Sequence, residues 1–254
     1  VAWLKNIGIT DAQVPPAEGT VDLCGTGISS VVKQVAMPTE VSEPVVDVTT
    51  IYDLPACEVK DYEDKFIAPS RTGRTDIGTA TLAATSNKRI PFHGNNDIMN
   101  LVGDCIHNTY AACNGDKSHD IALAESVIRG FHFEKVLPDT DAIIAARQFL
   151  IDHLTKIGVK VNEHHELQFN HLIGEQIVRG SMDLVWETAD GCVLVDFKTY
   201  PGKISDVVDP NHDHYAGRYK PQFDCYRSAL EAAGKHVLKS FVYYPINGTI
   251  VEIE

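Results

Sequence analysis

Two aspartates and a lysine in the second half of the chain are spaced so that they could act together on a phosphate ester. Asp196 and Lys198 are one residue apart, and Asp183 precedes them by a segment that contains Asp190-Gly191, a typical hairpin turn. Side chains alternate along a strand, so Asp196 and Lys198 would point to one face and Phe197 to the other. Counting outward from the turn places Asp183 opposite this segment on the preceding strand.

These three groups suit metal-assisted hydrolysis. Two carboxylates in contact repel each other unless a cation lies between them, and hard oxygen ligands favour Mg²⁺ or Mn²⁺. The metal would lower the pKa of a coordinated water and neutralise phosphate charge, while the ammonium would orient the water and stabilise developing negative charge. We therefore predict a Mg²⁺- or Mn²⁺-dependent phosphodiester hydrolase in which Asp183, Asp196 and Lys198 are the catalytic residues.

A simpler interpretation competes with this one. A single Asp-x-Lys pattern is more often a surface ion pair, with Asp183 an ordinary strand-end residue. The flanking run Val193-Leu-Val-Asp-Phe197 is otherwise apolar, however, which predicts a central, buried strand. Charged groups in a buried strand are costly unless they are paired or bind a ligand. The context therefore favours a functional site.

Further short elements surround this pair of strands. In chain order they are Gly103-Asp-Cys-Ile-His107, Glu166-Leu-Gln-Phe169, Gly180-Ser-Met-Asp183, Asp196-Phe-Lys198-Thr199 and Gln222-Phe-Asp-Cys-Tyr226. From about residue 97 to residue 245, the chain thus resembles the nuclease domain of RecB-type and AddA-type helicase–nucleases, a branch of the PD-(D/E)xK superfamily. The resemblance implies an α/β fold with a restriction-endonuclease-like core, in which helices flank a central mixed sheet.

The resemblance also implies roles for single residues. His107, Asp183, Asp196 and the backbone carbonyl of Phe197 would bind the metal, and Lys198 would assist the attacking water. Supporting or DNA-contacting roles would fall to Gln222, Tyr226, Thr199 and Glu166. Glu166 has two open interpretations, a residue that supports the site or a plain strand residue. No other cofactor is expected.

By the same resemblance, the chain would be a metal-dependent DNA nuclease domain, the C-terminal part of an ATP-dependent helicase–nuclease of double-strand-break repair and recombination. Its partners would be DNA, chiefly single-stranded ends, and the helicase domain of a parent chain or of a separate helicase subunit. The sequence has no Walker A motif and so no helicase motor of its own. The alternatives are a stand-alone phage or CRISPR-type exonuclease, a catalytically silent DNA-end-binding module, and a structural domain with coincidental motifs.

The elements that must position these residues follow from hydrophobic periodicity and end signals. Helices are predicted over residues 97–113, 119–130, 139–157 and 219–233, and strands over 159–169, 175–187, 192–198, 237–244 and 249–253. Residues 201–217 form a polar loop. The order of these elements predicts a mixed α/β sandwich in which a helix crosses over the sheet.

The N-terminal part of the chain has a different pattern. Residues 1–65 contain Pro15-Pro16, several glycines and short β-branched runs such as Val45–Ile51, which predict short strands and loops. They could be the edge of a preceding helicase-type domain, with the nuclease domain spanning 66–254. Residues 66–96 are polar and predict an irregular connector.

Composition sets outer limits on function. The formal net charge of −13 argues against a protein that simply coats DNA, although a bound metal would reverse the field locally. The six cysteines form no CxxC pair, which argues against a zinc ribbon or a tight iron–sulfur cluster and favours reduced thiols. With no signal peptide and no apolar run near the roughly 18 residues of a membrane span, the expected location is cytoplasmic.

Two histidine pairs give weaker signals. His164 and His165 are neighbours on a predicted strand, so they would point to opposite faces and could not bind one ion together. His212 and His214 lie in the polar loop, where an exposed position is expected rather than a second metal site.

Aromatic and basic residues alternate just before the last predicted helix, at Tyr215, Arg218, Tyr219 and Lys220. Such residues can stack bases and contact phosphates. A solvated loop explains them equally well, and both interpretations stay open.

Overall fold

The computed structural model describes residues 19–22, 29–32, 65–72 and 75–254. The chain divides into two compact units, Val1–Asp61 and Tyr62–Glu254. In the first unit, β1 (Gly19–Asp22) pairs antiparallel with β2 (Ser29–Val32). The predicted strand around Val45–Ile51 lies outside the described residues, as does most of the segment compared with a helicase edge.

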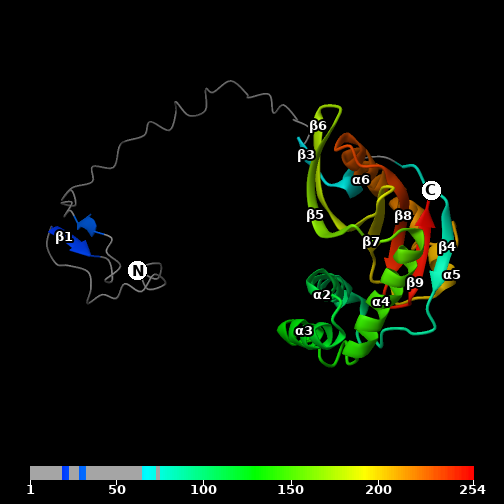
Figure 1. Ribbon diagram of the computed structural model, residues 1–254, viewed down its shortest axis with the longest axis horizontal. Helices are drawn as coiled ribbons and strands as arrows, with labels where there is room; N and C mark the ends of the chain where they lie inside the picture. The colour runs from blue at the N-terminus through cyan, green and yellow to red at the C-terminus, as the bar shows by residue number, and fades with distance from the viewer. Residues whose placement is uncertain (1–18, 23–28, 33–64, 73–74) are drawn as a thin grey trace, which may run out of the picture. The chain divides into compact units, whose positions relative to one another are not determined.

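A seven-stranded mixed sheet forms the centre of the second unit (Figure 1). The hairpin β5–β6 continues through β7, β8 and β9 to β4, and β3 pairs with the far end of β6. The β3–β6 and β7–β8 pairs are parallel and the others antiparallel. The strands are β3 (Phe66–Ile67), β4 (Ala80–Thr85), β5 (Asn162–Ile173), β6 (Gln176–Glu187), β7 (Cys192–Phe197), β8 (Val237–Tyr244) and β9 (Thr249–Ile253).

Helices pack on both faces of this sheet. The α-helices are α2 (Met99–Ala112), α3 (Lys117–Gly130), α4 (Thr140–Ile157), α5 (Ile204–Val208) and α6 (Lys220–Ala232), and the short 3-10 turns are η3 (Pro69–Arg71), η4 (Asn96–Ile98) and η5 (Ala216–Tyr219). The Asp139 carboxylate accepts the N–H of Ala142 at 2.9 Å and caps α4, which ends at Gly158. A capping aspartate thus explains where α4 begins.

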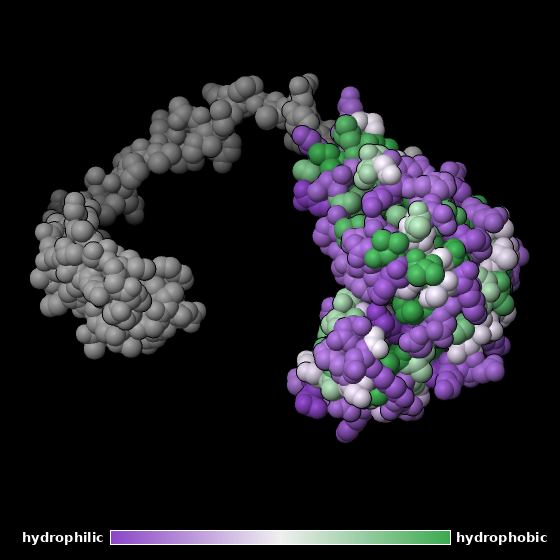
Figure 2. All heavy atoms as spheres, viewed as in Figure 1, coloured by the Kyte–Doolittle hydropathy of each residue, from purple (hydrophilic) through white to green (hydrophobic). Residues whose placement is uncertain are grey.

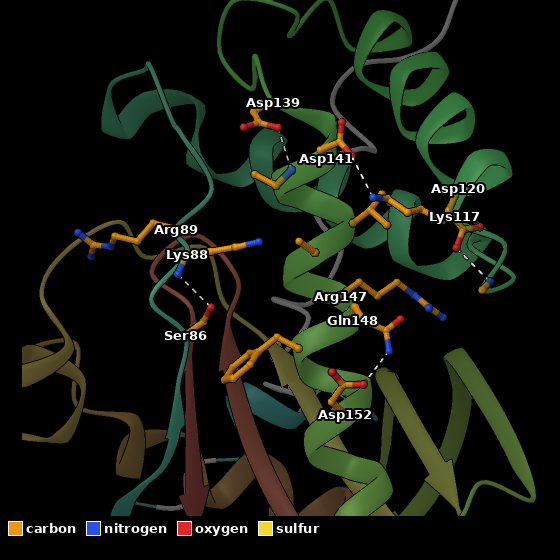
Figure 3. A pocket seen from close by; sticks show the side chains of 15 residues that line it. Ser86, Lys88, Arg89, Lys117, Asp120, Asp139, Asp141, Arg147, Gln148 and Asp152 are labelled. Carbon is orange, nitrogen blue, oxygen red and sulfur yellow. Dashed lines mark hydrogen bonds and ion pairs between the residues drawn. The ribbon is translucent and has the colours of Figure 1, made fainter.

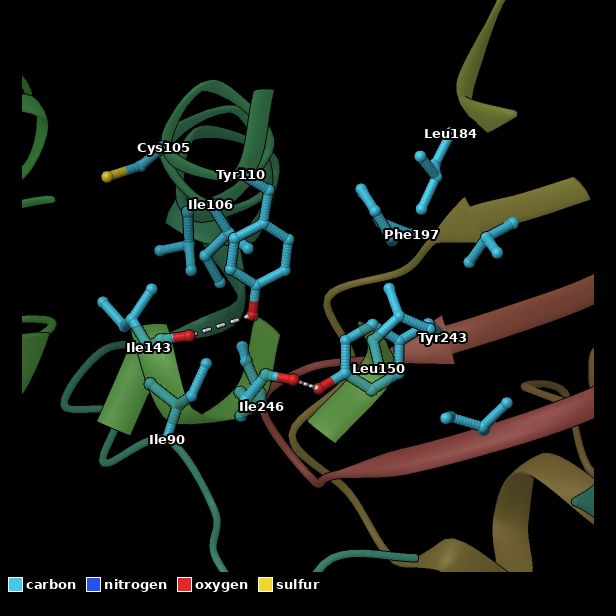
Figure 4. Packing of buried hydrophobic residues seen from close by; sticks show 14 of the residues in the cluster. Ile90, Cys105, Ile106, Tyr110, Ile143, Leu150, Leu184, Phe197, Tyr243 and Ile246 are labelled. Atoms are coloured by element: carbon cyan, nitrogen blue, oxygen red, sulfur yellow. Dashed lines mark hydrogen bonds between the residues drawn. The ribbon is translucent and has the colours of Figure 1, made fainter. Parts of the chain in front are cut away.

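Two hydrophobic cores hold these layers together. The first core joins α2, α3 and α4 to one sheet face and includes Ile106, Tyr110, Leu150, Leu184, Trp186, Val195, Phe197 and Tyr243 (Figure 4). The second core joins α5, η5 and α6 to the other face and includes Met182, Leu194, Phe223, Tyr226, Val242 and Tyr244. Every residue of β7 is buried between them. The prediction of a buried central strand is confirmed, as is the α/β class with a mixed sheet between helices.

Two loop predictions are wrong. Residues 66–96 are no irregular connector, because their described part contains β3, η3 and β4, and β4 pairs with β9 along the sheet edge. An edge strand faces solvent on one side, so its sequence shows little apolar alternation, and its partner is distant in sequence. The predicted polar loop 201–217 contains the short helix α5 and leads into η5.

The face of the second unit seen in Figure 2 is mainly hydrophilic, with small hydrophobic groups between polar ones. Within the ranges that the structure describes, none of the helices has the length and apolar character needed to cross a membrane.

Candidate active site and metal centre

The β6–β7 hairpin brings Asp183 and Asp196 together at the end of its ladder. Leu184 pairs with Val195, and the two aspartates come one position further along each strand. There the Asp183 carboxylate oxygen Oδ2 accepts the backbone N–H of Phe197 at 2.6 Å, where an antiparallel ladder would normally offer a backbone carbonyl. The carboxylate of Asp183 therefore lies directly against the backbone that carries Asp196.

Glu166 lies on the other side of Asp183, with an unusual backbone. On β5 its neighbours His165 and Leu167 pair with Leu184 and Met182, which leaves Glu166 opposite Asp183. Its φ of 48° is in the left-handed region, which a residue with a side chain rarely adopts in a strand. Non-glycine residues held in this way cluster at functional sites, because the surrounding structure must stabilise the strain.

His107 extends from α2 toward both carboxylates. Its Nδ1 is 3.5 Å from Glu166 Oε1, and its Nε2 is 3.9 Å from Asp183 Oδ2. The imidazole meets the ring of Phe197 edge to face, with the ring centroids 5.3 Å apart. This contact fixes the imidazole over the end of β7.

Gly103 explains how α2 comes so close to β7. A Cβ atom at this position would lie 3.3 Å from Thr199 Oγ1, and that hydroxyl donates to the carbonyl of Met99 at 3.2 Å. The absence of a side chain therefore lets the end of β7 approach the helix. Thr199 is placed as a link between β7 and α2.

The donor set fits a divalent cation. His107, Glu166 and Asp183 each offer one ligand atom, all within 4.8 Å of one another, and no other such group occurs among the described residues. The buried Asp196 Oδ2 lies 2.5 Å from Lys198 Nζ, as a charge-assisted ion pair. Carboxylate oxygens with one imidazole suit Mn²⁺ and, less well, Mg²⁺.

This group differs from the ligand set expected from the sequence. Glu166, expected in a supporting role, is brought into the group with His107 and Asp183. Asp196 lies next to the group and contacts Lys198. Phe197 contributes the N–H that binds Asp183, and metal binding by its carbonyl stays a prediction.

Gln222 and Tyr226 support the other face of the site from α6. Gln222 Nε2 donates to Asp196 Oδ1 at 2.7 Å and to the hydroxyl of Tyr226 at 2.6 Å. That hydroxyl donates to the carbonyl of Ser181 at 2.9 Å, and Ser181 Oγ donates to Glu166 Oε2 at 2.8 Å. Through Gln222, Tyr226 and Ser181, these hydrogen bonds link Asp196 to Glu166.

The electrostatics describe a site that attracts positive charge. Burial, together with the neighbouring Asp196 charge, raises the pKa of Asp183 to about 8, despite opposing effects of Lys198 and the Phe197 N–H. Burial lowers the pKa of His107, which favours the neutral imidazole that a metal ligand requires. Burial would lower the pKa of Lys198, but the Asp196 carboxylate outweighs burial and raises it. A divalent cation would relieve this repulsion between carboxylates.

The remaining histidines on β5 have separate partners. His164 lies 3.4 Å from Glu187, and His165 lies 2.8 Å from Glu163. Each of these two histidines thus has its own carboxylate partner. The rings of His212 and His214 are tilted by 34° with centroids 5.6 Å apart, and neither residue belongs to a metal-ligand group in the described part of the chain.

The tyrosines before α6 serve different purposes. Tyr215 is buried, and its hydroxyl donates to the carbonyl of Gly78 and accepts the N–H of Ala80, each at 3.0 Å. It therefore ties η5 to the edge strand β4. The ring of Tyr219 faces Lys198, whose Nζ lies 4.9 Å from the ring centroid. Sequence reasoning did not connect Tyr219 with Lys198, and the only signal was its place before α6.

A cavity of about 750 Å³ lies away from this site, between α4, the start of α3 and the segment after β4 (Figure 3). It is lined by four basic and four acidic side chains, Lys88, Arg89, Lys117, Arg147, Asp120, Asp139, Asp141 and Asp152. Several are already paired, as Lys117 is with Asp141 at 3.7 Å. These described lining residues include no group of metal ligands, so the size of the cavity does not mark it as the catalytic site.

Comparison with known proteins gives partial matches of one kind. The chain is similar to an ATP-dependent helicase/nuclease subunit of Thermoanaerobacter sp. (strain X514), with 37% identity over 79 residues, which is 30% of this chain and 6% of that protein. The corresponding protein of Anoxybacillus flavithermus (strain DSM 21510 / WK1) is 28% identical over 138 residues, 51% of this chain and 11% of that protein. That of Bacillus mycoides (strain KBAB4) is 39% identical over 85 residues, 32% and 7% respectively.

No family model matches the chain. The matches span only 6% to 11% of the length of these curated relatives. They support a relationship with the subunits of ATP-dependent helicase/nucleases and an association with DNA processing.

Proposed function

We propose that the unit Tyr62–Glu254 is a metal-dependent deoxyribonuclease domain of the PD-(D/E)xK type. The observation that carries the proposal is the convergence of Asp183, Asp196 and Lys198, with His107 and Glu166, at the end of the β6–β7 hairpin. Carboxylates from neighbouring strands, together with a lysine and an imidazole, are suited to metal-assisted phosphodiester hydrolysis. The similarity to ATP-dependent helicase/nuclease subunits supports DNA as the substrate.

His107, Glu166 and Asp183 would hold the cation, with Asp196 beside them as a further ligand. When bound, a Mg²⁺ or Mn²⁺ ion supplies an activated water and neutralises charge on the phosphate. Gln222 fixes the carboxylate of Asp196 through Oδ1, so that Oδ2 points toward Lys198. Lys198 stabilises negative charge that develops on the attacked phosphate.

The similarity to ATP-dependent helicase/nuclease subunits also suggests where the domain acts. We propose that the domain acts within or beside an ATP-dependent helicase–nuclease, in a cytoplasmic complex that processes DNA ends. A motor would deliver single strands to a chain whose net charge of −13 gives it little affinity for a polyanion.

The test is digestion of end-labelled single- and double-stranded DNA with Mg²⁺, Mn²⁺ or EDTA. Asp196→Asn removes one buried charge at the site, and Asp190→Asn makes the same change in the exposed turn of the same hairpin. We expect metal-dependent cleavage by the wild type and by Asp190→Asn, and a loss of at least about 100-fold in Asp196→Asn. DNA binding without cleavage under any metal would support the silent end-binding module instead.

A further inference from the structure

The ring of Tyr219 is the aromatic surface against which the Lys198 ammonium lies. Lys198 Nζ is 4.9 Å from the centroid of the ring, within the range of a cation–π contact. Tyr219 belongs to none of the five sequence elements that mark the site. It is the residue at which η5 ends and α6 begins.

The position of this ring is fixed by backbone structure around it. Tyr215, one turn earlier, binds Gly78 and Ala80 through its hydroxyl, and the carbonyl of Gly217 accepts the N–H of Gly78 at 2.9 Å. Tyr219 also packs against the second core. The ring is therefore held in place before any ligand binds, so little conformational entropy is lost when it contacts the Lys198 ammonium.

The ammonium of Lys198 lies where a bound cation would need space. It is 2.5 Å from Asp196 Oδ2, the buried oxygen that Gln222 leaves to other partners. A divalent cation on this oxygen would repel an ammonium that stayed beside it. The ammonium already lies within cation–π range of the Tyr219 ring, so the ring face would stabilise its charge if it moved away from Asp196.

We propose that Tyr219 is a positioning residue for Lys198. Its ring keeps the ammonium beside the scissile phosphate while Asp196 Oδ2 binds the cation. This inference rests on the proposed nuclease function. It assigns to Tyr219 an effect on the chemical step and on metal affinity, and none on nucleic-acid affinity. A ring that served packing alone would affect stability and neither of these properties.

The experiment replaces Tyr219 in the full 254-residue chain by phenylalanine and by phenylalanines with one, two and three fluorines. Each fluorine withdraws charge from the ring face and leaves its shape nearly unchanged. With phenylalanine retaining most of the rate, kcat should fall stepwise along the series to about one tenth, while KM changes less than twofold. Tyr219→Leu should reach the same low kcat.

Metal binding gives a second measurement that needs no cleavage. Titration of Mn²⁺ followed by electron paramagnetic resonance should show several-fold weaker binding in Tyr219→Leu, because the ammonium then stays on Asp196. Adding Lys198→Met to that variant should restore Mn²⁺ affinity. Thermal unfolding checks that each variant is folded, and the fluorinated series remains decisive if Tyr219→Leu is not.

The outcomes separate the two proposals. A wild type that cleaves DNA with a flat kcat across the fluorinated series overturns the role of Tyr219 and leaves the nuclease assignment intact. Equal Mn²⁺ affinity in Tyr219→Leu and the wild type overturns it as well. A wild type that neither binds Mn²⁺ nor cleaves overturns the proposed function, and the role of Tyr219 with it.

Discussion

Gln222→Leu is the substitution that tests the hydrogen-bond chain around Asp196 most directly. Gln222 Nε2 donates to Asp196 Oδ1 at 2.7 Å and to the Tyr226 hydroxyl at 2.6 Å. Leucine has a similar size and helix propensity but offers no donor. The variant therefore removes the donor of a carboxylate that is 1% exposed, while Tyr226 keeps its bond to the Ser181 carbonyl.

The magnitude follows from this burial. A buried acceptor that loses its hydrogen bond costs about 1–3 kcal/mol, because water cannot replace the donor. For a unit of this size, each kcal/mol shifts the midpoint of thermal unfolding by about 2–4 °C, so we expect a decrease of about 2–12 °C. Removing a group that orients a metal ligand typically weakens metal affinity or activity about 10- to 100-fold. The Mn²⁺ concentration for half-maximal cleavage should rise by that factor.

The assay combines calorimetry with cleavage at graded Mn²⁺ concentrations. Gln148→Leu is the matched control. Like Gln222, Gln148 donates from Nε2 to a carboxylate at 2.7 Å, but its acceptor, Asp152 Oδ1, lies on the same helix and is exposed to solvent. The control should lose less than about 0.5 kcal/mol and keep the wild-type Mn²⁺ dependence. If Gln222→Leu has the wild-type Mn²⁺ midpoint, the hydrogen bond does not position Asp196 and the reasoning is refuted.

Two further predictions concern stability. Burial would raise the pKa of Glu163, but hydrogen bonds from His165 and Lys160 and the Arg147 charge lower it to about 2. The stabilisation is therefore complete above about pH 4.5 and lost toward pH 2, so urea unfolding should find Glu163→Gln less stable than the wild type at pH 7 and equal near pH 2. Gly180→Ala would place a Cβ 2.8 Å from Pro69 Cγ and should lower the free energy of unfolding by about 1–3 kcal/mol in the same assay. In the double variant, Pro69→Ala should restore part of this stability. If the effects of the two substitutions simply add, the contact does not exist.

Local signals were sufficient to predict most helices and strands of the second unit. The helix Thr140–Ile157 has a cap, Asp139, and an apolar period that agree with each other, and the hairpin of Asp183 and Asp196 has a turn signal and a buried second strand. Strand Ala80–Thr85 was not predicted, since its pairing partner β9 lies more than 160 residues away in the sequence. A strand defined by such a distant partner leaves little trace in its own residues.

The candidate site was predicted unevenly for similar reasons. Sequence elements brought Asp183, Asp196 and Lys198 into one hypothesis, and the structure places them together. The left-handed backbone of Glu166, which turns its carboxylate toward His107, depends on contacts with the rest of the sheet and has no local signal. Spacing alone also could not indicate that Gly180 is kept small by Pro69, a residue from the segment expected to be a connector.

The parallel pairing of β7 with β8 has a consequence for how the protein is made. A ribosome releases Asp183, Asp196 and Lys198 well before α6 and β8, yet Lys198 donates its backbone N–H to Tyr243, and Asp196 depends on Gln222. Such contacts between distant residues form late in folding. A nascent chain therefore carries the candidate site residues before the segments that position them, so the site is complete only after β8 has joined the sheet.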